Sequence, residues 1–371
     1  MNPEDRDERF IRRALDLATR GLGRVEPNPI VGAVVVQGER VVGEGWHARF
    51  GGPHAEVVAL EQAGPAARGA ELFVSLEPCC HHGKTPPCTD AILSAGVRRV
   101  VAAVRDPFPE VAGRGLKVLS QAGVEVRVDV LATEARHANA AFFKRQATGL
   151  PLVIAKWAMS LDGCLAPPPG AGRWISSPAS RRRVHELRRI SDAVLVGAGT
   201  ARADRPSLTV REVEPLAERG QPTRVVLDGR LSLDPAVEPV RSAREAPVLL
   251  YTTEAAVRRE SARADALRRA GAELVAVAET ADGVAPDAVV QDLGARGMSR
   301  VLIEGGAKVL GSFFAAGLVD RVLVFISPKV LGGGGAASAG GAPAAPAVDL
   351  KDIRLSRVGP DILIEGRAGK F

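Results

Sequence analysis

Three possible zinc ligands, His54, Cys79 and Cys88, lie in one stretch of this chain and together would form one site. One His and two Cys supply three protein ligands, which leaves the fourth tetrahedral position open for water, as in catalytic rather than structural zinc sites. Glu56 lies beside His54 in the sequence, and its carboxylate can carry a proton from that water to departing ammonia. The pattern therefore predicts a zinc-dependent hydrolytic deaminase.

The local sequence places each ligand beside a regular element. His54 opens a run of apolar residues with helical spacing, and a strand-like run over residues 72–76 ends just before Cys79. Cys88 precedes a helix that is predicted from residue 89. Both thiols would then lie near helix N-termini, where the local field favours the thiolate that binds a metal.

Other interpretations of these residues stay open. The cysteines can be buried or reactive thiols that bind no metal. Cys80, His81 and His82 follow the second ligand directly, so an exchange of ligands is open from the sequence, although three ligands already suffice for a catalytic zinc. A zinc that only stabilises the fold is a further alternative, but such a site has no need of Glu56.

The length and the cysteine usage of the chain indicate two domains in a reducing compartment. Its 371 residues exceed the size at which one hydrophobic core usually stops growing, and 46% of them are hydrophobic. Three of the four cysteines fall in one local cluster, which argues against a disulfide framework. The first residues are charged, and no apolar run approaches the ~18 residues of a membrane span. We expect a cytoplasmic protein.

The net charge of +6 resides mostly in the second half of the chain. Residues 1–147 carry 19 basic and 18 acidic side chains, whereas residues 173–211 carry nine arginines against three acidic residues. Because the arginine fork binds phosphate through two hydrogen bonds, this segment could receive a phosphorylated small molecule or cofactor. A solvated helix face is the alternative for residues 181–183. Aromatic residues make up only 4% of the chain, which offers few surfaces for stacking a single-stranded nucleic acid.

Helix and strand signals alternate along both halves. An amphipathic helix over residues 10–18 and a hairpin over residues 30–45 begin the first half, and Pro151 marks the predicted boundary. The alternation predicts a three-layer α/β domain followed by a second α/β domain. Residues 332–346 are almost wholly Gly, Ala and Pro, and we expect them to form a mobile surface loop.

The second half contains glycine turns but no Gly-x-Gly-x-x-Gly fingerprint, so an ordinary dinucleotide-binding site is not expected there. The turns at residues 197–200 and 304–307 join predicted strands to the segments that follow. The backbone amides at the start of the helix predicted after the second turn could bind phosphate, although glycine equally serves a tight turn.

Longer stretches resemble one family over nearly the whole chain, the bifunctional riboflavin-biosynthesis deaminase/reductases. The eight residues between Cys79 and Cys88 differ from the Pro-Cys-x-x-Cys of nucleic-acid deaminases. Cys80 departs from the family, which more often has Ser there. The similar stretches are residues 27–34, 53–56, 77–88, 106–109 and 113–115 in the first half, and 156–163, 174–177, 204–211, 227–229 and 304–306 in the second.

The resemblance implies a fold and an activity for each half. Residues 1–147 would form a three-layer α/β/α cytidine-deaminase-like domain, and residues 148–371 a dihydrofolate-reductase-like α/β domain. The first would hold one zinc ion and remove the 2-amino group of 2,5-diamino-6-(5-phosphoribosylamino)pyrimidin-4-one. The second would use NADPH to reduce the ribosyl group of the product to ribityl. Asn28 would hydrogen-bond the heterocycle, and an Asx turn is the alternative role for it.

Further site residues are implied by their positions in the family's motifs. Lys156 and Glu304 would move protons near the sugar carbon that receives hydride, although Lys156 can also be a strand-end surface charge. Arg188 and Arg211 suit the phosphate of the substrate. The implied substrate-contacting positions are Gly172, Arg188, Leu208, Arg211 and Glu304. The implied cofactor-contacting positions are Ala158, Trp174, Thr200, Asp204, Gly229, Gly306, Ala307, Lys308, Val309, Leu310, Gly311 and Ser312.

The expected partner is a phosphorylated small-molecule pyrimidine, with no nucleic acid and no membrane, and we expect a homo-oligomer. A rival hypothesis is an RNA-modifying deaminase whose basic second half docks RNA and performs no redox step. The loop between Cys79 and Cys88 and the reductase-like order of the second half argue against that hypothesis. RNA affinity with a steep salt dependence would revive it.

Overall fold

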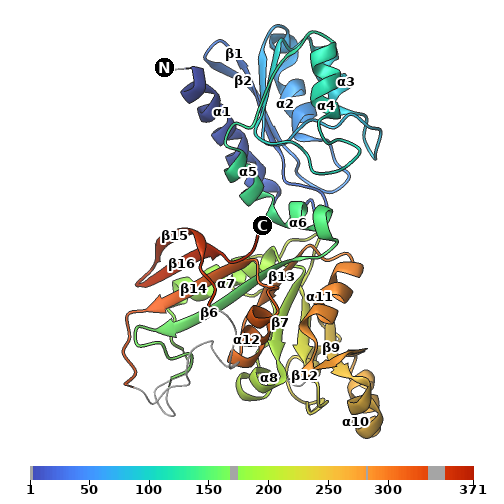
Figure 1. Cartoon of the computed structure of the whole chain (residues 1–371), viewed down its shortest axis with the longest axis vertical. Helices are drawn as coiled ribbons and strands as arrows, with labels where there is room; N and C mark the ends of the chain where they lie inside the picture. The colour runs from blue at the N-terminus through green and yellow to red at the C-terminus, as the bar shows by residue number, and fades with distance from the viewer. Residues whose placement is uncertain (1–2, 168–173, 281–282, 333–346) are drawn as a thin grey trace. The chain divides into compact units, whose positions relative to one another are not determined.

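The computed structural model describes residues 3–167, 174–280, 283–332 and 347–371 (Figure 1). The chain divides into two compact units between Thr148 and Gly149. Gly172 and residues 333–346 of the predicted surface loop lie outside the described residues. Within the described ranges, no helix combines the length and the apolar content that crossing a membrane requires.

The first unit is built on a five-stranded sheet in the order β2-β1-β3-β4-β5. β1 runs antiparallel to β2 and β3, whereas β3, β4 and β5 run parallel. The strands are β1 (Gly32–Gln37), β2 (Arg40–Trp46), β3 (Glu71–Val74), β4 (Arg99–Ala102) and β5 (Glu125–Val128). The helices are α1 (Pro3–Ala18), α2 (Ala55–Ala63), α3 (Cys88–Ala95), α4 (Arg114–Gln121), α5 (Ala132–Ala138) and α6 (Ala140–Thr148), with 3-10 turns at Thr19–Gly21 and Gly64–Ala67.

Helices cover both faces of this sheet. On one face, Phe10 and Ile11 of α1 pack in a core that includes Phe73 of β3. On the other face, α2, α3 and α4 share a core that includes Val35 of β1 and Ile92 of α3. β1 is buried on both sides, as expected for a strand between two helical layers. The predicted three-layer α/β/α arrangement is therefore confirmed.

Two glycines of β2 allow α2 to lie directly on the sheet. A side chain at Gly45 would place its Cβ 2.3 Å from the carbonyl oxygen of Ala55, and one at Gly43 would place it 2.1 Å from that of Ala59. Only glycine avoids these collisions. The close packing holds the N-terminus of α2, and with it His54 and Glu56, against the sheet.

The second unit contains a nine-stranded sheet in the order β10-β9-β8-β7-β13-β6-β14-β16-β15. The strands from β10 to β14 in this order run parallel, and β16 and β15 add an antiparallel edge. These strands are β6 (Leu152–Ser160), β7 (Ala193–Gly197), β8 (Thr223–Leu227), β9 (Val248–Thr253), β10 (Glu273–Val277), β13 (Arg300–Ile303), β14 (Arg321–Ser327), β15 (Lys351–Val358) and β16 (Asp361–Arg367). A separate pair consists of β11 (Glu279–Thr280) and β12 (Gly283–Val284).

Helices again pack on both faces of the central strands. α11 and α12 cover one face around Val289 and Phe313, and α8, α9 and α10 cover the other around Ala201 and Leu267. The helices are α7 (Pro178–Arg189), α8 (Ala198–Asp204), α9 (Glu254–Arg259), α10 (Ser261–Arg269), α11 (Pro286–Ala295) and α12 (Ala307–Ala315), with a 3-10 turn at Val240–Ser242. Because the strands are parallel, their carboxyl ends meet at one edge, where α/β sheets bind ligands.

Several elements were not predicted. α8 begins within the glycine turn at residues 197–200, where the sequence signals only a turn. The antiparallel strands β15 and β16 were also missed. β15 is exposed at every residue except Val358, and its two alternating apolar residues, Ile353 and Leu355, are 57% and 69% exposed.

Candidate active sites

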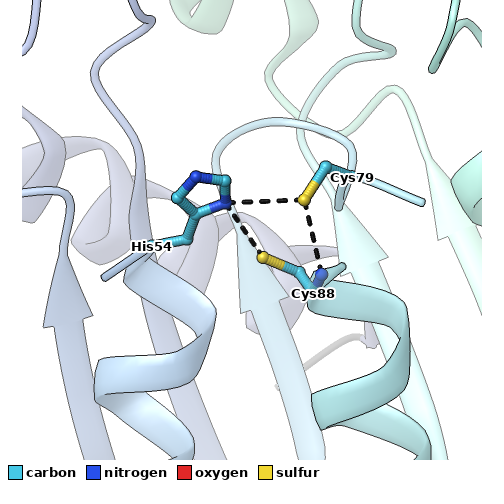
Figure 2. A group of neighbouring side chains, drawn as sticks. All are labelled: His54, Cys79 and Cys88. Atoms are coloured by element: carbon cyan, nitrogen blue, oxygen red, sulfur yellow. Dashed lines mark hydrogen bonds between the residues drawn. The ribbon is translucent and has the colours of Figure 1, made fainter. Parts of the chain in front are cut away.

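The three predicted metal ligands converge in the first unit (Figure 2). Nδ1 of His54 lies 3.2 Å from Sγ of Cys88 and 3.5 Å from Sγ of Cys79. The ligand atoms all lie within 4.8 Å of one another. A tetrahedral zinc with ordinary Zn–N and Zn–S bonds requires N···S separations of roughly 3.6 Å. The cluster therefore has the donor atoms and the approximate size that a zinc ion needs.

Two of the three ligands lie at the starts of helices. His54 precedes α2 in an extended conformation, and Cys88 is the first residue of α3. The backbone N–H of Cys88 donates to Sγ of Cys79 at 3.3 Å, so the N-terminus of α3 favours a thiolate there. Nε2 of His54 lies 3.3 Å from the hydroxyl of Thr85, which orients the ring so that Nδ1 faces the thiols.

The two thiols of the cluster differ in pKa. Hydrogen bonding with Cys88, together with His54, lowers the pKa of Cys79 to about 4 against the opposing effect of burial. The hydrogen bond to Cys79 and burial both raise the pKa of Cys88. The two thiols therefore do not ionise together unless a cation lies between them, which is the condition that a bound zinc provides.

Glu56 lies in the first turn of α2 and is only 3% exposed. Burial, together with the negative charge of Cys79, raises the pKa of Glu56 to about 7. A carboxyl group with that pKa exchanges its proton readily near neutral pH. Glu56 thus has Cys79, His54 and Cys88 as neighbours and a pKa that suits a proton carrier.

A cavity of about 430 Å³ opens beside the cluster and is lined by residues that include Asn28, His47, Glu56 and Asp106. His47 was not predicted. Its Nδ1 lies 3.0 Å from the carbonyl oxygen of Pro53, and its Nε2 lies 3.4 Å from Nδ2 of Asn28. With Nδ1 protonated, Nε2 accepts from Asn28, so His47 holds the Asn28 amide at the cavity wall.

Two further carboxyl groups near the cavity differ in function. Glu77, which is buried, accepts hydrogen bonds from the backbone N–H groups of Asp106, Gly113 and Leu116, so it ties the loop after β3 to the start of α4. Burial raises the pKa of Asp106 to about 7, and Asp106 lines the cavity. The sequence offered no spacing signal for the role of Glu77, because its partners are backbone groups far along the chain.

Cys80 and the two histidines after it lie outside the group of three donor atoms that could bind one ion in the described part of the chain. Sγ of Cys80 instead faces the carbonyl oxygen of Glu110 at 3.7 Å, and burial raises the pKa of this thiol. The ring of His81 packs near Phe108, and Lys84 lies over the ring of Phe50 at the cavity.

A second group of charged residues lies at the carboxyl edge of the large sheet. The register places Ile303 level with Ala155, so Glu304 and Lys156 follow at neighbouring positions. Nε and Nη2 of Arg188 donate to the two carboxylate oxygens of Glu304 at 2.6 and 2.7 Å. Both side chains are less than 10% exposed, at 9% and 8%. Nη1 of Arg188 also donates to the carbonyl oxygen of Thr209 at 2.9 Å.

This arrangement changes the role expected for Arg188. Its fork already holds Glu304, so it is better suited to orient that carboxylate than to bind a phosphate. Burial would raise the pKa of Glu304, but Arg188 and Lys156 outweigh burial and hold that pKa below its usual range. Burial lowers the pKa of Lys156, and Glu304 opposes part of that shift.

The two glycine turns lie on neighbouring strands at the same edge. The backbone N–H of Gly306 donates to the hydroxyl of Thr200 at 3.1 Å, and a Cβ at Gly306 would lie 2.8 Å from that hydroxyl. A Cβ at Gly199 or Gly305 would meet nothing within 4 Å. Gly305, before the start of α12, and Gly199, in the first turn of α8, therefore border open space, which fits a cofactor with phosphate groups.

The remaining predicted positions differ in location and in exposure to solvent. Ala158 lies on β6, Asp204 ends α8, and the exposed Trp174 lies under the guanidinium of Arg181. Leu208 is buried, so only its backbone can reach a substrate, whereas Arg211 is exposed. Leu310 and Gly311 are buried within α12, whereas the other five residues of that run, Gly306, Ala307, Lys308, Val309 and Ser312, are partly or fully exposed.

Both halves of the chain match known protein families. The family model of the cytidine and deoxycytidylate deaminase zinc-binding region matches residues 4–104, and that of the RibD C-terminal domain matches residues 151–364. The riboflavin biosynthesis protein RibD of Aquifex aeolicus is 42% identical over 328 residues, which are 88% of each chain. The chain belongs to the RibD family.

Solved RibD structures agree over the full length of the chain. RibD of Acinetobacter baumannii is 34% identical with a TM-score of 0.83 and covers 99% of this chain and 100% of its own. The Thermotoga maritima diaminohydroxyphosphoribosylaminopyrimidine deaminase/5-amino-6-(5-phosphoribosylamino)uracil reductase is 37% identical with a TM-score of 0.82, covering 98% and 99%. As a RibD, the chain is a bifunctional deaminase and reductase of riboflavin biosynthesis. The predicted fold class and family are confirmed.

Proposed function

We propose that residues 1–147 deaminate 2,5-diamino-6-(5-phosphoribosylamino)pyrimidin-4-one and that residues 148–371 reduce the ribosyl group of the product to ribityl with NADPH. The convergence of Nδ1 of His54 with the thiols of Cys79 and Cys88, next to the buried Glu56, carries the first part of this proposal. The ion pair of Arg188 and Glu304 beside Lys156, with the glycine turns of the same sheet edge, supports the second.

In the first unit, His54, Cys79 and Cys88 would hold the zinc ion. A bound zinc supplies a Lewis acid that makes water nucleophilic near neutral pH. Glu56 takes the proton of the attacking water and delivers it to the 2-amino group, so a C–O bond forms, the C–N bond breaks and ammonia leaves. Asn28, oriented by His47, would hydrogen-bond the heterocycle at the cavity wall.

In the second unit, NADPH supplies hydride to the sugar carbon that bears the amino group. Opening of the ribose ring frees an oxygen that must gain a proton, and Lys156 and Glu304 are ionisable groups at that edge of the sheet. Arg188 would keep the Glu304 carboxylate ionised and oriented. The exposed Arg211 remains suited to the phosphate of the substrate.

We also propose a cytoplasmic homo-oligomer that binds neither nucleic acid nor membranes. The edge strand β15 supports self-association, because Ile353 and Leu355 on it are 57% and 69% exposed and Ile362 of β16 is 44% exposed. An exposed apolar edge strand is prone to pair with another chain. Light scattering of the full chain measures the oligomeric state.

The deaminase assignment is tested by following ammonia release and NADPH oxidation together in wild-type and Glu56→Gln protein. We expect the substitution to lower ammonia release by roughly 10²- to 10⁴-fold, because the proton carrier is lost, and to leave the zinc content unchanged. NADPH oxidation falls with it, because its substrate is no longer made. Unchanged ammonia release in Glu56→Gln would contradict proton transfer by Glu56. Ammonia without NADPH oxidation in wild type would refute the reductase assignment.

A further inference from the structure

The loop after β8, residues 228–233, begins level with the first glycine turn. β8 lies next to β7 in the sheet, and Leu227 pairs with Gly197. In parallel sheets that bind dinucleotides, the pyrophosphate lies at the first glycine turn and the adenosine ribose lies beside the next strand. An acidic residue there binds the 2′-hydroxyl of NAD, whereas an arginine accommodates the 2′-phosphate of NADP. The chain lacks the Gly-x-Gly-x-x-Gly fingerprint of those sheets, but its loop after β8 has the same place relative to the glycine turn and is where a 2′-hydroxyl or a 2′-phosphate would lie.

Asp228 lies at the position of such an acid, but its carboxylate is hydrogen-bonded within its own loop. Its Oδ2 accepts from the backbone N–H groups of Ser232 at 2.6 Å and Leu233 at 2.8 Å, and its Oδ1 accepts from the hydroxyl of Ser232 at 2.9 Å. The side chain is only 3% exposed. Binding a ribose hydroxyl would require breaking these bonds, so Asp228 stabilises the loop and does not favour NADH.

Arginines border the same loop. Arg202 of α8 donates from Nη1 to the hydroxyl of Ser232, and both Arg202 and Arg230 are exposed. Arg259 and Arg263 donate to the carbonyl oxygens of Arg230 and Leu231 at 3.4 and 3.1 Å. Among the described residues, no carboxylate lies within ion-pairing distance of Arg202 or Arg230. The cationic charge at this loop is therefore not neutralised locally by an ion pair to either residue.

We propose that Arg202 and Arg230 bind the 2′-phosphate of NADPH, with Ser232 positioning Arg202, and that this pair selects NADPH over NADH. The inference rests on the proposed reductase function and adds the residues that set its cofactor preference. A guanidinium fork suits the dianionic phosphate, and the hydrogen bond to Ser232 brings Arg202 from α8 to the loop. NADH offers a hydroxyl there, which gives these cations no charge to neutralise.

The test is calorimetric titration of the full chain with NADPH, NADH, adenosine 2′,5′-bisphosphate and adenosine 5′-monophosphate. Arg202→Gln and Arg230→Gln are compared with wild type, and Arg268→Gln on the exposed surface of α10 is the matched control. Each test variant should weaken binding of NADPH and of the 2′-phosphorylated fragment by roughly 10- to 100-fold, as loss of a hydrogen bond to a charged group implies. Binding of NADH should change by less than about threefold, and the control should change neither. Arg202→Lys should retain part of the affinity because it keeps the charge.

The outcomes separate this inference from the proposed function. Wild-type protein that binds NADPH and NADH equally, or variants that weaken both nucleotides alike, would overturn the 2′-phosphate assignment while leaving a nucleotide-dependent reductase. Wild-type protein that binds neither nucleotide would overturn the reductase proposal itself.

Discussion

In the ion pair of Arg188 and Glu304, the arginine binds another side chain, which leaves it less able to bind the substrate. Both groups are almost fully buried, and a buried carboxylate keeps its charge only when a cation and hydrogen bonds compensate for the lost water. The paired oxygens of Glu304 leave the fork of Arg188 with little capacity for a phosphate. We therefore expect Arg188 to act as a positioning residue in the proposed reductase site.

Replacing Arg188 by Lys tests this role. Lysine keeps the positive charge but not the two-bond geometry, so we expect kcat of the reductase to fall roughly 10- to 100-fold and KM for the pyrimidine to change by less than about threefold. The same substitution at Arg183, which is on the same helix and pairs with Glu186, is the control and should change neither. Steady-state kinetics of NADPH oxidation measure both constants. A large rise in KM with unchanged kcat would show instead that Arg188 binds the phosphate.

At the scale of elements, an ionic network joins α1 to the strands β3, β4 and β5. Asp7 of α1 accepts hydrogen bonds from Arg99 of β4 at 2.9 and 2.8 Å and from Arg127 of β5 at 2.7 Å. Arg6 of α1 and Arg99 both reach Glu71 of β3. Burial alone would raise the pKa of Asp7, but the two arginines outweigh it and lower that pKa. The network thus fixes the first helix on its face of the sheet.

Asp7→Asn should lower the free energy of unfolding by roughly 1–3 kcal/mol at neutral pH, because it removes charge-assisted hydrogen bonds. The pKa of Asp7 is lower in the folded than in the unfolded chain, so its contribution is complete above the unfolded pKa of about 4 and is lost as the pH falls through the folded pKa. Urea denaturation of both proteins at pH 7 and pH 3 measures this difference, which should shrink at pH 3. Asp5→Asn, at an exposed position of α1, is the control. A difference that is equal at both pH values would contradict the ionic origin.

At the scale of the whole molecule, the two chemistries belong to units with separate sheets and separate cores. The residues proposed for deamination all come from the first unit, and those proposed for reduction all come from the second. Each site therefore has its own supporting structure, and a substitution in one is not expected to change the geometry of the other.

This independence predicts that each activity survives loss of the other. Glu56→Gln, when given 5-amino-6-(5-phosphoribosylamino)uracil, should oxidise NADPH at the wild-type rate, because the first step is bypassed. Glu304→Gln should release ammonia normally but oxidise NADPH at least about 10²-fold more slowly. Parallel measurement of ammonia and NADPH absorbance checks both expectations. Failure of the supplied product to restore oxidation in Glu56→Gln would show that the two sites depend on each other.

The sequence by itself determined the local chemistry and the class of fold. The types and order of His54, Glu56, Cys79 and Cys88 predicted the cluster, because metal ligands at helix starts leave recognisable local patterns. Alternating apolar runs predicted α/β units for the same reason. The helix α8 was missed because its seven residues carry no such periodic signal, and β15 was missed although Ile353 and Leu355 alternate with polar residues.

Only the tertiary structure decided how the polar groups are paired. Arg188 meets Glu304, Asp228 is occupied within its own loop, and His47 reaches Asn28. Electrostatic effects depend on distances in space and on exclusion of water, and residues far apart in the sequence acquire both only when the sheets assemble. The identity of a charged residue therefore suggested its chemistry, whereas its neighbours in the fold determined whether it serves substrate, cofactor or another side chain.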